Sequence, residues 1–411
     1  MTKDSILEQI SENIISVWKS NSTQPLSDKE WAQCNLEEFS DQIKKENEDL
    51  LNEFLRNTNK KTIDFDSFIC REKILYAKKY LGDSLYKEYF NNIATFYDSI
   101  RKTEPEFDLN QLWQVLSNYL VYAIILAMLD EKQQYNDSIK AFCLLYPYTD
   151  NYIDSTDITL AEKARFNDMI YSSLNDLPVT LSDDLSKKIH MCLKDCQNYL
   201  DSSRKEVVTS ALLLMLDSQR NSSSLDGMIS SQYNDNYNEL ISMLAYKGGM
   251  TILNDYIFAV TKENTKDLQF FLQLGMVLQL ADDLLDTNDD VIKNAPTLFS
   301  LVPDIETREA NINRLMHYTL DVFTKYEPLN EKVHTFMLRT IMILFGFAVM
   351  RNQQYYSDEF KENICRFMPF TKEYLITINA RLSEAAYPSD NNIQETRTKI
   401  DSIISLLKNE I

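Results

Sequence analysis

Helical periodicity over long stretches constrains this chain more than any other feature of its sequence. Apolar residues recur every three or four positions, the spacing that places them on one face of an α-helix, and signals for β-strands are weak. Only six glycines and nine prolines occur among the 411 residues, so few positions break these stretches. The pattern predicts an all-α fold with long helices over Leu109–Leu129, Tyr233–Val260, Leu268–Asp286, Ile305–Tyr326 and Leu329–Tyr356.

The domain organisation follows from the absence of a linker. The chain is longer than a typical domain, but no segment rich in glycine, serine or proline divides it. We predict a single core formed by residues 106–411, with residues 1–105 as an N-terminal helical segment packed on it. The first twenty residues have the pattern of an amphipathic helix that carries Asp4, Glu8 and Glu12, which is unlike a signal peptide.

Composition argues against several classes of function. The formal net charge of −20 leaves no basic stripe to neutralise nucleic-acid phosphates. The longest apolar run, Tyr119–Leu129, is shorter than the roughly 20 residues that span a bilayer. We therefore expect no nucleic-acid partner, no transmembrane segment and a cytoplasmic location.

Catalytic histidines and reactive cysteines are also scarce. There are three histidines, no nucleophile motif surrounds a serine, and glycine-rich nucleotide loops are absent, which argues against a hydrolase triad or a two-histidine metal site. Of the six cysteines, Cys192 and Cys196 are four residues apart with His190 nearby. We interpret these two as reduced helix residues rather than as zinc ligands.

The most informative segment for function is Gly275–Asp290, GMVLQLADDLLDTNDD, which places aspartates on an otherwise apolar helix. Asp282 and Asp286 project from the same side one turn apart, with Asp283 beside them. Buried carboxylates are costly without a cation, and Mg²⁺ is commonly held by one or two carboxylates together with substrate phosphates. The segment predicts a metal and diphosphate site. A solvated acidic helix end is the alternative, because Asp289 and Asp290 follow at once.

A second pair of carboxylates, Asp150 and Asp154, lies behind an apolar stretch that predicts a helix over Ile139–Tyr148. Pro147 predicts either a kink in that helix or a helix start at Tyr148.

Between the two acidic segments lies the sequence YKGG, Tyr246–Gly249. Its paired glycines would let a ligand or a neighbouring helix approach closely, and Lys247 could contact a phosphate. A helix break and a solvated surface lysine are the alternatives.

This order of motifs resembles the class I isoprenoid synthase superfamily, which includes trans-prenyl diphosphate synthases, squalene and phytoene synthases, and class I terpene cyclases. Gly275, Gln279 and the three aspartates match the pattern GxxxQxxDDxxD, and Lys293–Leu298 (KNAPTL) resembles a downstream Lys-x-x-x-Thr-Leu segment. The likeness covers roughly residues 110–355, with about 130 residues between the acidic motifs. It implies a single-domain helical bundle around a central cavity.

The resemblance also implies roles for individual residues. It predicts Mg²⁺ as the cofactor, as three ions that assemble with the substrate diphosphate, held by Asp150, Asp154, Asp282 and Asp286. Asp283 joins these four in the predicted catalytic set. The residues predicted to bind the diphosphate are Lys247, Arg220, Arg351 and Lys293, with Tyr355 one turn beyond Arg351. The aromatic residues near the motifs are candidates for the cavity wall, although most are expected to be plain core: Tyr119, Tyr122, Phe142, Tyr146, Tyr152, Phe258, Phe345 and Phe347.

The first motif departs from the pattern of chain-elongating members. Where they have adjacent aspartates, this chain has Asp150 followed by Asn151, and the Arg-Arg pair beyond the motif is missing because Arg165 stands alone. We therefore favour a class I terpene synthase, which ionises one linear prenyl diphosphate, cyclises the cation and quenches it to a hydrocarbon or alcohol. The alternatives are a prenyl transferase, chain-elongating or squalene-type, and a catalytically silent relative that binds a lipid. A homodimer is compatible with each of them.

Overall fold

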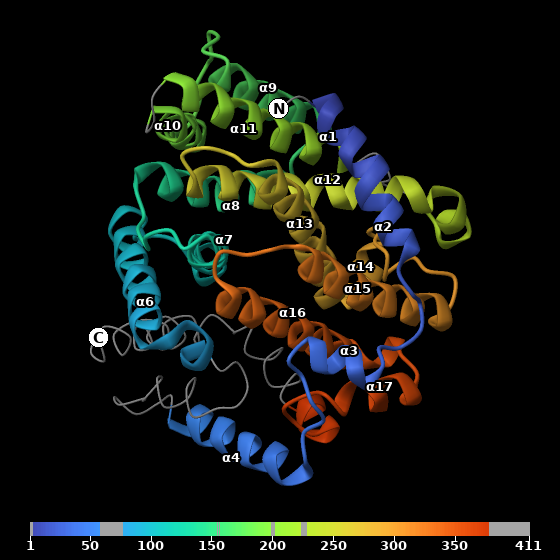
Figure 1. Cartoon of the computed structure of the whole chain (residues 1–411). Coiled ribbons are helices and arrows are strands. Elements are labelled where there is room, and N and C mark those ends of the chain that lie inside the picture. The colour runs from blue at the N-terminus through green and yellow to red at the C-terminus, as the bar shows by residue number, and fades with distance from the viewer. Residues whose placement is uncertain are drawn as a thin grey trace.

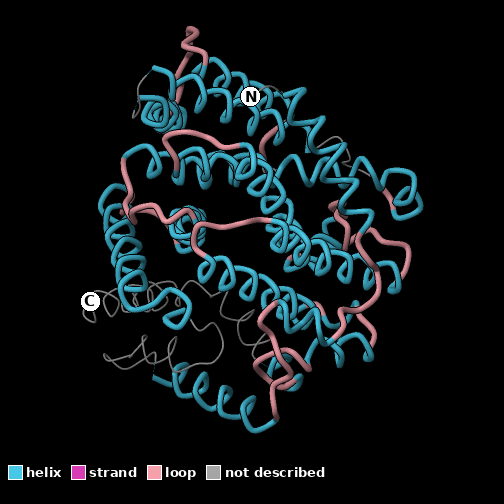
Figure 2. The backbone as a smooth tube through the Cα atoms, in the orientation of Figure 1, coloured by secondary structure: helices cyan, strands magenta, loops and turns pink. Residues whose placement is uncertain are grey.

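The computed structural model describes residues 3–57, 77–153, 155, 157–198, 202–222 and 228–377. Within these ranges helices are joined by loops and turns, and no segment forms a β-strand (Figure 1, Figure 2). The predicted all-α class is confirmed. In chain order the α-helices are α1 (Lys3–Gln9), α2 (Ile15–Ser20), α3 (Asp28–Gln33), α4 (Asp41–Asn57), α6 (Ala77–Thr103), α7 (Leu109–Met128), α8 (Asp137–Ile153), α9 (Leu160–Leu174), α10 (Asp184–Asn198), α11 (Ser202–Ser222), α12 (Tyr233–Ala259), α13 (Thr265–Leu285), α14 (Thr287–Lys293), α15 (Ile305–Lys325), α16 (Glu331–Arg351) and α17 (Asp358–Cys365).

The N-terminal helices lie against the motif-bearing half of the chain. A π-helical turn, Ile10–Ile14, joins α1 to α2, and this continuous rod packs on α12 and α15 (Figure 1). Trp18 is fully buried there, and its indole Nε1 donates a hydrogen bond to the hydroxyl of Tyr237 on α12 over 2.9 Å. The amphipathic helix expected at the N-terminus is therefore present from Lys3 onward. The boundary at residue 105 stays a prediction.

Each helix predicted from periodicity is present, and most end close to the predicted residues. The range Leu329–Tyr356 was too long, because α16 ends at Arg351. The predicted ranges Tyr233–Val260 and Ile305–Tyr326 differ from α12 and α15 by one residue at the C-terminal end. Helix α13 begins at Thr265, three residues earlier than predicted, because Asn264 caps it. The side-chain oxygen of Asn264 accepts hydrogen bonds from the backbone amides of Lys266 (2.8 Å) and Asp267 (3.3 Å).

Pro147 neither ends nor starts a helix. The residue lies inside α8, which continues to Ile153, so the alternative of a helix start at Tyr148 is wrong. Pro147 lacks an amide hydrogen for the carbonyl one turn earlier, but the helical hydrogen bonds on either side maintain the geometry. The consequence is that Asp150 sits on the last full turn of a continuous helix.

Helix α7 is surrounded by other helices. It packs against α6, α8, α12 and α16, and Figure 1 shows it nearly end-on among its neighbours. Among the described residues, three helices have the length and apolar composition to cross a membrane, in the windows Gln111–Met128, Thr265–Leu285 and Glu331–Arg351. These windows are longer than the run of apolar residues on which the prediction of no transmembrane segment was based. Between 61% and 67% of each window is buried inside the protein, because α7, α13 and α16 pack against one another or their shared neighbours.

Candidate active site

The site is built on the crossing of α12 and α13, which is exceptionally close at three glycines. A Cβ atom added to Gly248 would lie 2.6 Å from Cβ of Gln279, and one added to Gly275 would lie 2.6 Å from Cα of Gly249. Any side chain at Gly248 or Gly275 would therefore push the two helices apart. The glycines admit a neighbouring helix, which is one of the two roles predicted for YKGG, and α12 continues through them without a break.

This crossing brings Lys247 to the acidic motif, 35 residues further along the chain. The positive charge of Lys247 lowers the pKa of both Asp282 and Asp283, against a larger rise caused by burial. Lys247 is half-buried, and its Nζ makes no hydrogen bond or ion pair with any residue that the structure describes. The predicted neighbourhood of Lys247 and the aspartates is therefore present, with the lysine held near the carboxylates but not bonded to them.

The acidic motif continues further than predicted. The amide of Asp286 donates to the carbonyl of Asp282, and the amide of Asp290 donates to the carbonyl of Asp286, each over 2.9 Å. Helical hydrogen bonding thus persists across the junction of α13 and α14, and the three side chains lie one turn apart on one side. We call Asp282, Asp286 and Asp290 the acidic face. Asp290 was missed as a site residue, although its spacing of four from Asp286 is visible in the sequence.

Burial dominates the electrostatics of these carboxyls. Desolvation, followed by the neighbouring aspartates, raises the pKa of Asp290 to about 7 and raises the pKa of Asp282 and Asp286. The Asp282 side chain nevertheless has substantial accessible surface. Both observations hold if solvent reaches the carboxylate from one side while protein atoms surround its other sides.

Asp283 differs from its neighbours because it points into the protein. It is 7% exposed, its Oδ1 accepts a hydrogen bond from Nε2 of Gln279 over 2.8 Å, and its Oδ2 has no partner among the described residues. Burial raises the pKa of this carboxyl to about 8. Gln279 and Asp283, two residues of the GxxxQxxDDxxD pattern, therefore contact each other on the side of α13 that faces the core.

Two more of the predicted cations flank the acidic face. Arg351, at the end of α16, lowers the pKa of Asp286, and Lys293, at the end of α14, lowers the pKa of Asp286 and Asp290. Within the described part of the chain neither forms an ion pair. Arg220 forms an ion pair with Asp168 on α9, with Nη2 of the arginine 3.2 Å from Oδ1 of the aspartate. The structure thus brings Lys247, Lys293 and Arg351 to the acidic face and ties Arg220 to a carboxylate on another helix.

The first motif lies at the end of α8, which packs against α7, α10 and α12. Asp150 is half-buried, and Asp154 lies outside the described residues. Asn151, which stands where the pattern of chain-elongating isoprenoid synthases has a carboxylate, exchanges two hydrogen bonds with Gln114 of α7, over 2.9 and 3.1 Å. The meeting of this motif with the acidic face stays a prediction.

Sequence reasoning also missed a buried asparagine that ties α16 to the acidic motif. Asn352, next to Arg351, is 1% exposed. Its Nδ2 lies 2.9 Å from the carbonyl of Leu284 and 3.0 Å from that of Leu285, and its Oδ1 accepts the amide of Asn288 over 3.1 Å. An asparagine after a long apolar helix has the pattern of an ordinary helix cap, so no local signal distinguishes it.

Most aromatic candidates are core residues, as expected. Tyr119 stacks on Phe96 with ring centroids 3.7 Å apart, Phe142 packs on Phe258 at 5.1 Å, and Phe345 is fully buried. Tyr146 is exposed. A cavity lined by these residues stays a prediction.

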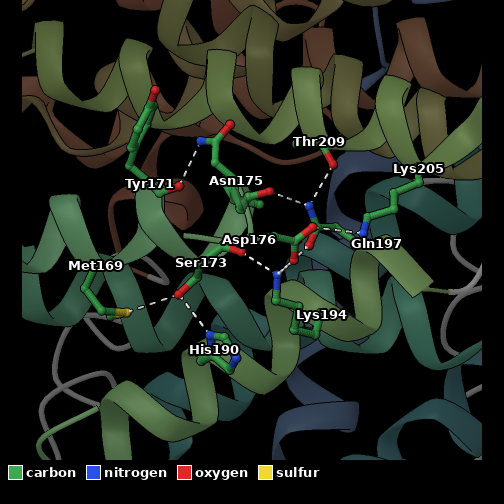
Figure 3. A network of polar contacts seen from close by, with 11 residues as sticks. Met169, Tyr171, Ser173, Asn175, Asp176, His190, Lys194, Gln197, Lys205 and Thr209 are labelled. Atoms are coloured by element: carbon green, nitrogen blue, oxygen red, sulfur yellow. Dashed lines mark hydrogen bonds and ion pairs between the residues drawn. The ribbon is translucent and has the colours of Figure 1, made fainter. Parts of the chain in front are cut away.

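A separate polar network joins α9, α10 and α11 (Figure 3). Lys194 donates to the carbonyl of Ser173 and to Asp176, each over 2.5 Å, and Gln197 donates to the carbonyl of Leu174 over 2.8 Å. These carbonyls belong to the last turn of α9, which has no further helical amides to bind. Nδ1 of His190 lies 3.0 Å from the hydroxyl of Ser173, but Ser173 is 1% exposed. The network is a helix cap that fastens three helices, rather than a Ser-His catalytic pair.

The described residues contain no group of three carboxylate, imidazole or thiol side chains that converges closely enough to hold a metal ion. Mg²⁺ does not require such a group, because it keeps several waters and takes substrate phosphates as ligands. The described cysteines are buried free thiols, including Cys192 and Cys196 on α10. None of the protein-family models, curated proteins or solved structures with which the chain was compared matches it. The likeness to isoprenoid synthases therefore rests on the motifs and their arrangement.

Proposed function

We propose that the protein is a class I terpene synthase that ionises one linear prenyl diphosphate and converts the resulting cation to a cyclic hydrocarbon or alcohol. One observation carries the proposal: the glycine crossing of α12 and α13 places Lys247 beside Asp282 and Asp283 without an ion pair. Charges of both signs held close but unbonded suit a ligand that carries both, such as a metal-bound diphosphate.

The residues of the acidic face fit Mg²⁺. All their donors are carboxylate oxygens, which this ion prefers, and the burial that raises their pKa values would be offset by a cation. Asp282, Asp286 and Asp290 would hold metal from α13 and α14, and Asp150 would do so from the end of α8. Asp154, the other predicted ligand of the first motif, lies outside the described residues. When bound, Mg²⁺ supplies positive charge that stabilises the departing diphosphate.

The remaining site residues bind the substrate and orient it. Lys247, Lys293 and Arg351 approach the acidic face from three helices, so their charges can bind different oxygens of one diphosphate. Asp283 accepts a hydrogen bond from Gln279 one turn earlier on α13 and lies near Lys247 of α12. The apolar helices α7 and α16 supply the dry surroundings that an allylic cation needs.

A single substrate is favoured by the residues that follow the first motif. Arg165 lies on α9 close enough to lower the pKa of Glu162, one turn earlier on the same exposed surface. Elongation requires two diphosphates held side by side, and their repulsion in a medium of low dielectric constant is large without fixed cations. The described residues after Asp150 supply no second cluster of arginines.

The test is incubation of the purified protein with Mg²⁺ and linear prenyl diphosphates of graded chain length, followed by analysis of released diphosphate and extracted products. We expect one allylic diphosphate to suffice for release of inorganic diphosphate and formation of a hydrocarbon or alcohol. Isotopic label from isopentenyl diphosphate in a longer prenyl diphosphate would establish a transferase instead. Failure to turn over any substrate would leave the lipid-binding alternative.

A further inference from the structure

Arg351 and the acidic face belong to packed helices that a buried side chain also links by hydrogen bonds. Asn352 follows Arg351 directly, and its backbone amide donates to the carbonyl of Ala348, which ends α16. Its side chain reaches across to α13 and α14, where it contacts the carbonyls of Leu284 and Leu285 and the amide of Asn288. These three groups immediately flank Asp286, one of the predicted metal ligands.

The chemistry of the contact requires an amide side chain. The carbonyls of Leu284 and Leu285 end α13 and accept from Nδ2 of Asn352, and the Leu284 carbonyl also accepts from the hydroxyl of Thr287 over 2.9 Å. The amide of Asn288 lies in the first turn of α14 and needs an acceptor. Among neutral side chains the carboxamide provides two donors and an acceptor on one rigid plane. With 1% exposure, Asn352 keeps water from replacing any of these hydrogen bonds.

A second set of contacts holds the same turn. The side-chain Oδ1 of Asn288 accepts hydrogen bonds from the hydroxyl of Tyr355 over 3.1 Å and from Nε2 of Gln354 over 3.2 Å. The guanidinium of Arg308 lies over the Tyr355 ring, 5.1 Å from its centroid, and donates to the Tyr355 carbonyl. The segment after Arg351 is therefore fixed to the α13–α14 junction from both sides.

We propose that Asn352 is a positioning residue that holds Arg351 beside Asp286 at a spacing where the two charges interact without pairing. This inference rests on the proposed function, because it assigns the gap between the two side chains to a bound diphosphate. Without Asn352 the end of α16 is free to shift, and Arg351 can form an ion pair with Asp286. That pair removes a diphosphate-binding cation and a metal ligand together.

The test is calorimetric binding of inorganic diphosphate in the presence of Mg²⁺ to the full-length protein and its variants. We expect Asn352→Ala to weaken binding about tenfold or more, a loss equivalent to about 1.4 kcal/mol. The matched control is Asn254→Ala. Asn254 is also 1% exposed and also donates to carbonyls of two helices, those of Ala211 and Met250, but it lies two turns beyond Lys247 on α12.

The readout that separates positioning from stability is the coupling to Arg351. We expect Arg351→Ala to weaken diphosphate binding in the wild-type background and to add little in the Asn352→Ala background, but to keep its full effect beside Asn254→Ala. Additive losses with Asn352→Ala would overturn the inference. Equal weakening by the two asparagine variants would also overturn it.

Tyr355→Phe serves if Asn352→Ala does not fold. It removes only the hydroxyl that binds Asn288 and leaves the ring against Arg308, so we expect a weaker loss of binding with the same reduced effect of Arg351→Ala. An unchanged effect of Arg351→Ala in this background would contradict the proposal. Wild-type protein that binds diphosphate but turns over no prenyl diphosphate would defeat the proposed function and leave Asn352 testable. Wild-type protein that does not bind diphosphate would defeat both.

Discussion

The two acidic motifs differ in how the protein holds them. Around α13 the carboxylates of the acidic face are partly desolvated and have cations from three helices nearby, and glycines and a buried asparagine fix the helices that carry them. At the end of α8 the neighbour of Asp150 is an exposed asparagine that pairs with Gln114 of α7. In the first region, contacts between helices fix the spacing of the aspartates and the nearby cations. In the second, Asp150 lies at a helix end whose neighbouring polar contact is on the surface.

The two motifs therefore differ in how much folding free energy their carboxylates cost. The charge cluster on α13 costs folding free energy, since desolvated carboxylates are unfavourable without a cation. A bound cation would offset this cost, which is why the proposed function places Mg²⁺ at the acidic face. The predictions below test how far the two regions differ.

The largest effect is expected for the proposed metal ligands. Asp282→Asn and Asp150→Asn should each reduce turnover by about 10² to 10³ fold, because each removes charge stabilisation from the transition state rather than core packing. Circular dichroism should show an unchanged helical fold. Turnover kinetics with a prenyl diphosphate that the wild-type protein accepts would measure the loss. Full activity of Asp150→Asn, with loss in Asp282→Asn, would confine the site to the α13 region.

A smaller loss is expected for the lysine at the crossing. Lys247→Ala should weaken diphosphate binding and slow ionisation by about 10 to 100 fold, the equivalent of one charged hydrogen bond of about 1.5 to 3 kcal/mol. Lys247→Arg should retain part of both, because the charge survives with a different geometry. Isothermal calorimetry and single-turnover kinetics would separate the two effects. Wild-type values in Lys247→Ala would return this residue to a surface role.

The glycine crossing should affect stability by a comparable free energy. A methyl group at Gly248 meets backbone atoms of Gly275, so Gly248→Ala should lower the free energy of unfolding by about 1 to 3 kcal/mol. Gly346→Ala is the control, because its methyl group meets the flexible side chain of Met368, which can move aside. Urea unfolding monitored by circular dichroism would compare them. A loss for Gly346→Ala as large as that for Gly248→Ala would argue against a special constraint at the crossing.

A buried carboxyl between the two regions predicts pH-dependent stability. Asp255 on α12 is fully buried, neither of its oxygens has a partner among the described residues, and burial raises its pKa well above the usual range. It lies near Cys143 of α8, whose pKa it raises further. The folded state then binds the proton more tightly than the unfolded chain, so stability falls as pH rises above the unfolded pKa of about 4.

Asp255→Asn should lack the pH dependence of stability that this carboxyl causes. Relative to wild type, the variant should gain stability between about pH 4 and neutral pH, by about 1.4 kcal/mol for each unit by which the folded pKa is raised. Denaturant unfolding of both proteins across that range measures the difference, in which other titrating groups cancel. A constant difference between the proteins at all pH values would mean that Asp255 ionises normally.

The sequence supported the prediction of helices and of the α12–α13 half of the site, because periodicity and short motifs are local signals. Lys247 and Asp282 were expected in one site because the order of their motifs resembles that of isoprenoid synthases, and the paired glycines beside Lys247 predicted the close approach of a ligand or a neighbouring helix. The roles of Arg220 and Asn352 were not predictable in this way. Arg220 binds Asp168, and Asn352 binds the end of α13, and both contacts join residues far apart in the chain. Such pairings depend on how helices pack, which no single segment encodes.

The smallest effect is expected at the position where the first motif departs from the pattern of chain-elongating isoprenoid synthases. Asn151→Asp keeps the oxygen that accepts from Nε2 of Gln114 and loses the amide that donates to Oε1, on an exposed surface. We expect a change in stability within about 0.5 kcal/mol and little change in turnover, because surface substitutions away from buried networks are tolerated. The double variant Gln114→Glu/Asn151→Asp places two carboxylates against each other. Like-charge repulsion should by contrast weaken the α7–α8 contact in this variant. A large rise in turnover or in magnesium affinity for Asn151→Asp would show that the amide limits metal binding at α8, and the two motifs would then differ in ligand number rather than in how the fold holds them.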